Sequence, residues 1–336
     1  MTATIPALPV RTETPSWWQR FNKATVAMFG VTVVLFVVFG VASPNFLTFG
    51  NISNLATQVA ITLIVAVAMT FVITTGQIDL SVGSTLAFVA ACTAELLQAG
   101  LDSSLVIVIG LLAGLAWGLL NGWLSAYQKI PSFIVTLATM SIIRGLAQFW
   151  TQGFSVPIDA RLSVAQLGSA KFLGFSVLAW IAIITVMLGG LVLAKTPFGN
   201  YVNGIGSQEE SVRRAGVRTA RIKMITLALA GLAAGAAGIL TAARLGSGSS
   251  NSGQGFELTV IAAVVLGGTN LFGGRGTMTG TAIGAVITGV IANGLTLLGV
   301  SPFLTPIVTG LVLIIAIWVN MRGRSFAELF AHLVRR

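Results

Sequence analysis

The sequence predicts an all-α, polytopic membrane protein with about ten transmembrane helices, arranged as two inverted five-helix repeats. Of its 336 residues, 55% are hydrophobic and 8% are charged, whereas a soluble domain carries about 25% charged residues. The mean hydropathy is +0.93, and the apolar residues form long runs. The 39 glycines fit closely packed transmembrane helices, because small residues let two backbones approach each other.

Ten apolar runs approach the roughly 20 residues that a helix needs to cross a bilayer. The third and the eighth run are short and rich in small residues. They are therefore expected to be half-helices or tilted segments that are buried in protein. In chain order the runs are 24–42, 55–75, 83–98, 104–127, 131–151, 176–194, 221–243, 257–272, 276–298 and 303–321.

The polar segments outside these runs define three further parts of the chain. Residues 1–23 contain three prolines and are expected to form a cytoplasmic N-terminal tail. The first run lacks the small-residue pattern of a signal-peptide cleavage site, so it is expected to be retained as a helix. The membrane domain is predicted over 24–321, with a cytoplasmic loop at 195–220 and a cytoplasmic C-terminal tail at 322–336.

The distribution of basic residues predicts the orientation of the chain. With the N-terminus inside and ten crossings, fifteen of the nineteen bases fall in cytoplasmic segments and three in outer segments. This asymmetry follows the positive-inside rule and places both termini in the cytoplasm. The net charge of +10 therefore indicates membrane orientation rather than nucleic-acid binding. The three outer bases are Arg161, Lys171 and Arg244, and Arg144 falls within the fifth run.

The longest outer segment, 151–175, is expected to contain a short interfacial helix. It carries Pro157, Asp159, Arg161 and Lys171 between two apolar runs. It is also a candidate landing surface for an external partner.

Two pairs of similar segments indicate the internal repeat. Residues 76–82 (GQIDLSV) resemble residues 253–260 (GQGFELTV), with one residue inserted. The pair Asn121-Gly122 precedes the segment 131–136, and Asn293-Gly294 precedes 301–305 in the same order. Five spans separate the paired segments, so the two halves would have opposite topology, with a transport pathway at their interface. The alternative is two similar glycine-rich helix starts, each with an acid near its N-terminus.

No catalytic constellation is present in the sequence. It has no H-E-x-x-H pair and no G-x-S-x-G elbow. Residues 268–275 (GTNLFGGR) have the glycine spacing of a Walker A loop but lack its Lys-Ser/Thr. One Cys and one His cannot form a metal cluster. We therefore expect a non-enzymatic chain with no cofactor and no metal, with any ATP hydrolysis in a separate partner.

Polar residues inside the predicted spans are candidates for a translocation pathway or a gate. Asp79 and Glu257 are intramembrane acids at helix starts, where they either cap the helix or act in gating. An intramembrane Asn forms an interhelical hydrogen bond or lines the pathway. Arg144 is expected to be a structural anchor near the outer end of its helix. The full set of pathway or gate candidates is Asp79, Ser81, Asn121, Phe133, Thr136, Glu257, Asn293 and Phe303.

The segment 204–223 concentrates two of the nine acids and five of the nineteen bases. Its acids and arginines recur at helical spacing and end at a glycine, which predicts a short exposed polar helix. The positive-inside rule alone would require the bases but not the acids or the bracketing glycines. We therefore interpret this loop as a docking surface for a soluble partner, formed by Gly206, Gln208, Glu209, Glu210, Arg213, Arg214 and Gly216.

Three of these stretches carry a resemblance to a known family. They are 76–84 (GQIDLSVGS), 204–216, and 266–280 with its LGGTNLFGGRG run. The sequence resembles the permease subunits of bacterial ABC sugar importers of the ribose/arabinose/xylose type, over about residues 45–320. It departs from the family pattern at Gln77 and at Ser207-Gln208-Glu209.

The resemblance implies the activity and the partners of the chain. It implies a multi-pass permease of the bacterial inner membrane that works as a homodimer or heterodimer and moves a monosaccharide by alternating access. A cytoplasmic ATP-binding subunit would dock on the loop at 208–214, and a periplasmic sugar-binding protein would deliver the substrate. Two alternatives remain open. One is a related ABC importer for amino acids or another small polar solute, and the other is a gradient-driven secondary transporter that uses Asp79 and Glu257.

Overall fold

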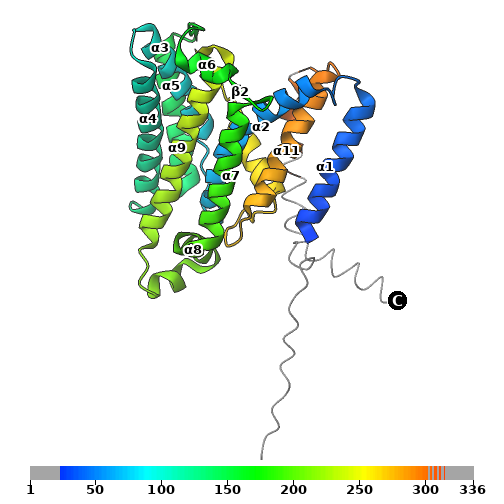
Figure 1. The fold of residues 1–336 in the computed structure, drawn as a ribbon. Helices are drawn as coiled ribbons and strands as arrows, with labels where there is room; N and C mark the ends of the chain where they lie inside the picture. The colour runs from blue at the N-terminus through cyan, green and yellow to red at the C-terminus, as the bar shows by residue number, and fades with distance from the viewer. Residues whose placement is uncertain (1–22, 302, 305, 309, 312–313, 315–336) are drawn as a thin grey trace, which may run out of the picture.

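The computed structural model describes residues 23–301, 303–304, 306–308, 310–311 and 314, and over these residues the chain is a bundle of helices (Figure 1). Four short strands form two small antiparallel ladders, β1 with β4 and β2 with β3. The elements in chain order are α1 (Lys23–Ala42), α2 (Phe49–Thr74), α3 (Val82–Gln98), α4 (Ser103–Ala126), α5 (Ser132–Thr151), β1 (Ser155–Pro157), α6 (Ser163–Ser169), β2 (Lys171–Phe172), β3 (Phe175–Ser176), α7 (Val177–Lys195), α8 (Pro197–Arg214), α9 (Thr219–Leu245), β4 (Ser247–Ser249), α10 (Phe256–Leu266) and α11 (Met278–Leu297).

The prediction of an all-α polytopic membrane protein is confirmed. Among the described residues, six helices are long and apolar enough to cross a membrane, namely α2, α4, α5, α7, α9 and α11. Shorter apolar helices lie in α1, α3 and α10. Nine of the ten predicted spans thus coincide with a helix in the described part of the chain. The tenth, 303–321, and both predicted tails lie largely outside it.

One predicted span is too long. The run 257–272 was expected to be helical throughout, but α10 ends at Leu266. The backbone at Gly268, Gly273 and Gly274 has positive φ values of 80°, 91° and 85°, which a right-handed helix cannot contain. The apolar residues after Leu266 therefore form a glycine-rich loop rather than two more helical turns. We call residues 267–277 the glycine loop.

The expectation of short, buried helices is confirmed for α3, which is buried along most of its length. The first turns of α3 and α10 lie against each other. A Cβ atom on Gly83 of α3 would lie 2.7 Å from the carbonyl oxygen of Gly253 and would collide with the carboxylate of Glu257. The N-termini of both half-helices therefore meet inside the protein, where glycine permits the contact.

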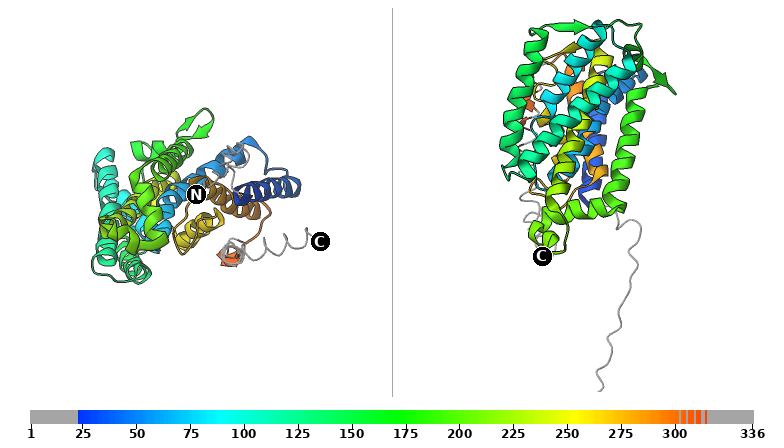
Figure 2. Two further views of the ribbon diagram at one scale, coloured as in Figure 1. Left: turned by 90° about the horizontal axis from the view of Figure 1, so that it is seen from below. Right: turned by 90° about the vertical axis from the view of Figure 1, so that its left-hand side faces the viewer.

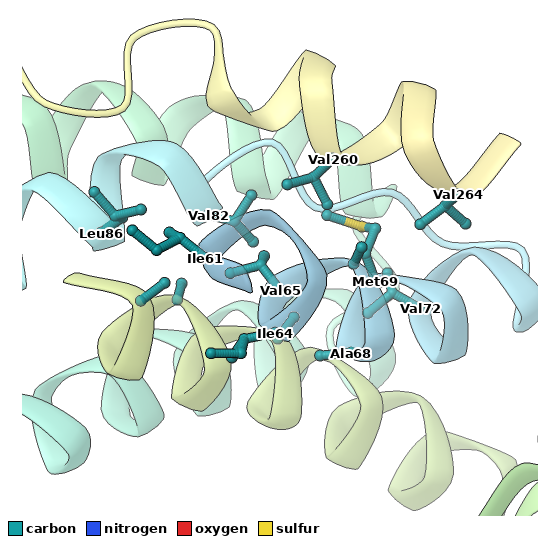
Figure 3. Close-up of a cluster of buried hydrophobic side chains, with 14 of the residues drawn as sticks. Ile61, Ile64, Val65, Ala68, Met69, Val72, Val82, Leu86, Val260 and Val264 are labelled. Atoms are coloured by element: carbon teal, nitrogen blue, oxygen red, sulfur yellow. The ribbon is translucent and has the colours of Figure 1, made fainter. Parts of the chain in front are cut away.

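Helix α2 lies at the centre of the bundle and contacts α7, α9, α10 and α11. Figure 3 shows the main buried cluster, in which Val65 and Met69 of α2 pack with Val82 of α3 and with Val260 and Val264 of α10. Helices α4 and α9 run side by side in extensive contact. This core fixes the starts of both half-helices against α2.

The contacts between helices have the correspondence that an internal repeat predicts. If α2 is matched with α9, α3 with α10 and α4 with α11, then the contact between α3 and α9 has its counterpart in α10 with α2. In the same way, α4 with α9 corresponds to α11 with α2, and α3 with α4 corresponds to α10 with α11. The packing thus supports the relation that the paired sequence motifs suggested.

The two ends of the bundle differ. At one end lie α6 and both strand ladders, and at the other lies α8 (Figure 1). We call these the strand end and the α8 end. A short helix does lie within 151–175, namely α6, of seven residues; its place at the membrane interface stays a prediction.

We predict that Gly231→Val will destabilise the bundle. A Cβ atom at Gly231 would lie 2.7 Å from the backbone of Gly118 and would collide with the carbonyl of Gly114, so α4 and α9 would have to separate. Overpacking of this kind costs about 1–3 kcal/mol. The measurement is thermal unfolding of the detergent-solubilised chain. Gly30→Val is the matched control, because no atom lies within 4 Å of a Cβ there. Equal melting temperatures for the two variants would contradict the prediction.

Candidate functional site

Helix α8 contains the predicted docking residues except Gly216 and is divided in two. The hydroxyl of Thr196 accepts a hydrogen bond from the amide of Gly199 (3.3 Å) and so caps its start. At Gln208 the backbone leaves the helical region, with φ −163° and ψ 91°. Residues 209–214 therefore form a separate short helix, which ends before Gly216 with its φ of 85°. The predicted short polar helix is confirmed, and we call residues 209–214 the distal helix.

The charged side chains of the distal helix have two kinds of partner. Glu210 pairs within the helix, with Arg213 and with Arg214, whose Nε lies 3.0 Å from its Oε1. Glu209 instead pairs with Lys223 of α9, at 3.0 Å between Oε2 and Nζ. The first pairings are local and largely exposed, so they contribute little to stability. The second joins the distal helix to the membrane domain.

The pKa of Glu209 is lowered by its surroundings. Partial burial is the largest single effect and raises the pKa, but the hydrogen bond and charge of Lys223, together with Thr219 and Arg213, lower it by more in sum. Glu209 therefore stays ionised at neutral pH. Its interaction with Lys223 is present above the ordinary carboxyl pKa and is lost only as the pH falls through the lowered folded-state value.

The first part of α8 contacts the end of α2 and the glycine loop. A Cβ atom on Gly206 would collide with the carbonyl of Thr74 and with the amide of Gly274. These two groups are themselves joined, because the amide of Gly274 donates to the carbonyl of Thr74 at 2.9 Å. The hydroxyl of Ser207 also donates to the carbonyl of Gly274 at 3.5 Å. Gly206, predicted as part of the docking surface, is thus a contact between α8 and the membrane domain.

A cavity of about 730 Å³ opens between the distal helix and the membrane domain. Four segments meet around it: the connection between α2 and α3, the turn between α4 and α5, the distal helix and the start of α9. The residues Phe133, Glu209, Glu210 and Arg213, which the sequence suggested for two different roles, line this one cavity. The structure therefore brings one residue of the pathway set, Phe133, together with three residues of the docking set.

The connection between α2 and α3, residues 75–81, is the polar centre of the site, and we call it the α2–α3 linker. Gln77 is buried, and its amide donates to the hydroxyl of Ser125 on α4 at 3.2 Å. The hydroxyl of Thr226 on α9 donates to the Gln77 carbonyl oxygen at 3.4 Å. Sequence reasoning missed the role of Gln77. The sequence did contain a signal, because a side-chain amide that is buried inside a membrane domain needs hydrogen-bonding partners.

Helix α5 holds the next residue of the α2–α3 linker. The hydroxyl of Ser132 accepts from the amide of Ile78 at 3.1 Å, and the hydroxyl of Thr136 donates to the carbonyl of Ile78 at 3.3 Å. Thr136, a predicted pathway residue, is therefore placed at the linker. Phe133 lies between them in sequence, is half exposed and lines the cavity.

Asp79, Ser81 and Asn121 form one buried network. Asp79 Oδ1 accepts from the amide of Ser81 at 2.8 Å and from its hydroxyl at 2.6 Å. The amide of Asn121 on α4 donates to the same hydroxyl at 2.9 Å. All three side chains are buried. Asp79 thus holds the turn that leads into α3, while the N-cap residue Ser81 makes no side-chain cap.

Glu257 lies at the start of the other half-helix, against Gly83. The loop that precedes α10 is held by Arg144 of α5, whose guanidinium donates to the carbonyls of Ser250 and Ser252 at 2.6 and 2.7 Å. Arg144 is thus the structural anchor that the sequence predicted. Its hydrogen-bonding partners are backbone carbonyls, while Glu257 lies near enough for the two charges to interact.

Two candidates lie apart from this site. Asn293 of α11 forms a reciprocal amide pair with Asn51 of α2, at 2.9 and 3.0 Å, which is the interhelical alternative considered for it. Phe303 is 86% exposed in the described chain. Neither residue lines the cavity.

Comparison with known proteins assigns the chain to a family. Residues 51–317 match the family described as the branched-chain amino acid transport system / permease component. The chain belongs to this permease family. No solved structure matches it.

Several curated permeases are similar to the chain over most of their length. The ribose import permease protein of Bacillus subtilis (strain 168) is 40% identical over 290 residues, covering 86% of this chain and 90% of the relative. The ribose import permease protein of Escherichia coli (strain K12) is 37% identical over 306 residues, covering 90% and 94%. The L-arabinose ABC transporter permease protein of Azospirillum brasilense is 38% identical over 308 residues, covering 92% and 90%.

We predict that Asp79→Asn will keep the permease folded and that Asp79→Leu will not. The asparagine oxygen can still accept from the amide and hydroxyl of Ser81, whereas leucine leaves buried donors without a partner, at about 1–3 kcal/mol. Folded yield after size-exclusion chromatography in detergent measures the difference. Equal loss of folded yield for both substitutions would contradict the prediction, because it would show that folding requires the charge itself.

Proposed function

We propose that the chain is the membrane-spanning permease subunit of an ATP-driven importer and that its substrate is a monosaccharide. The observation that carries the substrate class is the 37–40% identity to ribose and L-arabinose permeases over 86–92% of this chain. The family description also names branched-chain amino acids. The ribose and arabinose relatives favour a sugar.

The α8 end faces the cytoplasm in this proposal, and a separate ATP-binding subunit docks there. The basic residues of the distal helix and of the start of α9 support this orientation. The docking surface comprises Gln208, the distal helix and Gly216. Because Glu209 is joined to Lys223 and Gly206 touches the end of α2, a movement of α8 would be transmitted to the α2–α3 linker.

The cavity at the α8 end is the cytoplasmic part of the proposed pathway. Its lining includes the Gln77 amide, the Ser132 hydroxyl and the exposed ring of Phe133. Amides and hydroxyls can exchange hydrogen bonds with sugar hydroxyls, and an aromatic face suits the apolar face of a sugar ring. A second permease chain completes the membrane assembly, and a periplasmic sugar-binding protein supplies substrate at the strand end.

The test of the proposed activity is transport by the assembled complex. The chain is purified from native membranes with its co-purifying partners, reconstituted in proteoliposomes with ATP inside, and offered labelled ribose, arabinose or leucine. We expect ATP-dependent uptake of ribose or arabinose and none of leucine. Leucine uptake would favour the amino acid alternative. Uptake that follows an ion gradient without ATP would refute the importer proposal.

We predict that Glu209→Lys combined with Arg213→Glu will abolish sugar-stimulated ATP hydrolysis while leaving membrane insertion intact. The exchange inverts the charge pattern of the proposed docking surface and places two positive charges, at 209 and 223, against each other. ATPase activity of the reconstituted complex is the measurement. Lys195→Glu, a charge reversal at the exposed last residue of α7 and outside the proposed docking set, is the control. Normal uptake by the double variant would contradict the docking assignment.

A further inference from the structure

The strand end carries a small hairpin that the proposed transport function does not use. Strands β2 and β3 pair with Lys171 opposite Ser176 and Phe172 opposite Phe175, joined by Leu173 and Gly174. We call residues 171–176 the aromatic hairpin. It projects sideways from the bundle beside the start of α7, in both further views (Figure 2). Its direction is across the bundle axis rather than along it.

The tip of the aromatic hairpin is apolar and exposed in the single chain. Leu173 is 73% exposed and Phe172 is 60% exposed. Leu173 has a φ of 52° and Gly174 one of 82°, as expected for a two-residue turn of the type that favours Asn-Gly. A bulky residue is unusual in this left-handed conformation. The preferred backbone conformation of leucine therefore does not explain its presence at the tip. A non-aqueous environment for its side chain does explain it.

The base of the aromatic hairpin is fixed to two membrane helices. The ring of Phe172 meets Trp180 of α7 edge-to-face at 5.8 Å, and the Trp180 indole N–H donates to the Phe172 carbonyl at 3.0 Å. Phe175 packs against Phe49, the first residue of α2, at 5.5 Å. Phe49 is itself 62% exposed. The exposed apolar surface is therefore continuous with the starts of α2 and α7.

The depth of the aromatic hairpin relative to the bilayer follows from the length of α7, the helix that it precedes. Helix α7 begins at Val177, directly after the hairpin, and has 19 residues with one charge, at its last residue. At 1.5 Å per residue it spans about 28 Å, close to the roughly 30 Å of bilayer hydrocarbon. The hairpin thus lies at a membrane boundary, where Trp and other aromatic side chains form belts. Lys171 can extend its ammonium group to lipid phosphates while its stem stays apolar.

We propose that the aromatic hairpin is a membrane-interface anchor. Its partner is the phospholipid surface: Phe172 and Leu173 enter the boundary between acyl chains and headgroups, and Lys171 faces the headgroup phosphates. The anchor holds the starts of α2 and α7, which lie at the strand end of the bundle, at a constant depth in the membrane.

The test places a fluorophore on the hairpin tip of the full chain. Cys92 is the one cysteine and is buried, so Cys92→Ala with Leu173→Cys gives a single labelling site. The labelled protein is reconstituted in vesicles that contain lipids brominated in the upper acyl chain. We expect blue-shifted emission and strong quenching by these lipids. The matched control is Ala160→Cys, an exposed position at the strand end between Asp159 and Arg161, which should stay unquenched.

A second variant separates anchoring from folding. Asparagine accepts the left-handed conformation more readily than leucine, so Leu173→Asn should leave the fold intact while removing the apolar tip. In the Leu173→Asn variant, a fluorophore attached at Lys171→Cys should then be quenched much less by the brominated lipids. Water-like emission at position 173, or quenching unchanged by Leu173→Asn, would overturn the proposal. The proposal would also be overturned if the fluorophore at position 173 were shielded from water only in the presence of a second permease copy or an added binding protein.

Discussion

The arrangement depends on one constraint: the α2–α3 linker is irregular backbone buried inside a membrane domain. In such a place every polar backbone group needs a partner within the protein. Helix α5 supplies partners for the backbone of Ile78 through Ser132 and Thr136. Helices α4 and α9 bind the buried side chain of Gln77 through Ser125 and Thr226. The positions of these three helices are therefore tied to a segment that has no regular structure of its own. A shift of any one of them would break a buried hydrogen bond or force the linker to move with it.

The α8 segment is attached where it can act on this linker. Thr74 is the last residue of α2, and its carbonyl is in contact with both Gly206 and the glycine loop. The next residues along the chain are the linker itself. On the other side, Glu209 is joined to Lys223, which lies one helical turn before Thr226. Two separate contacts thus connect α8 to the same buried segment, while the break at Gln208 separates the distal helix from the part that touches α2.

The sequence was sufficient to predict the helices because apolar runs near 20 residues have few other uses. It was also sufficient for the distal helix, whose charges repeat at helical spacing. It did not locate the end of α10, because the predicted span was carried across Gly267–Asn270 to the apolar residues Leu271 and Phe272, whereas the helix ends at Leu266 and the backbone turns at Gly268. The partners of Gln77 and of Asn293 lie far away in sequence. Such pairings depend on helix packing, which no local pattern specifies.

Helix α5 has a position that neither the composition nor the family would single out. Near its start, Ser132 and Thr136 hold the linker that leads into α3, and further along, Arg144 holds the loop that leads into α10. Arg144 lies twelve residues after Ser132, about 18 Å along the helix. One rigid helix therefore spans both irregular segments that begin the half-helices. Because the two half-helices also touch at Gly83 and Glu257, a tilt of α5 would displace both together. This makes α5 the element that fixes the starts of α3 and α10 relative to each other.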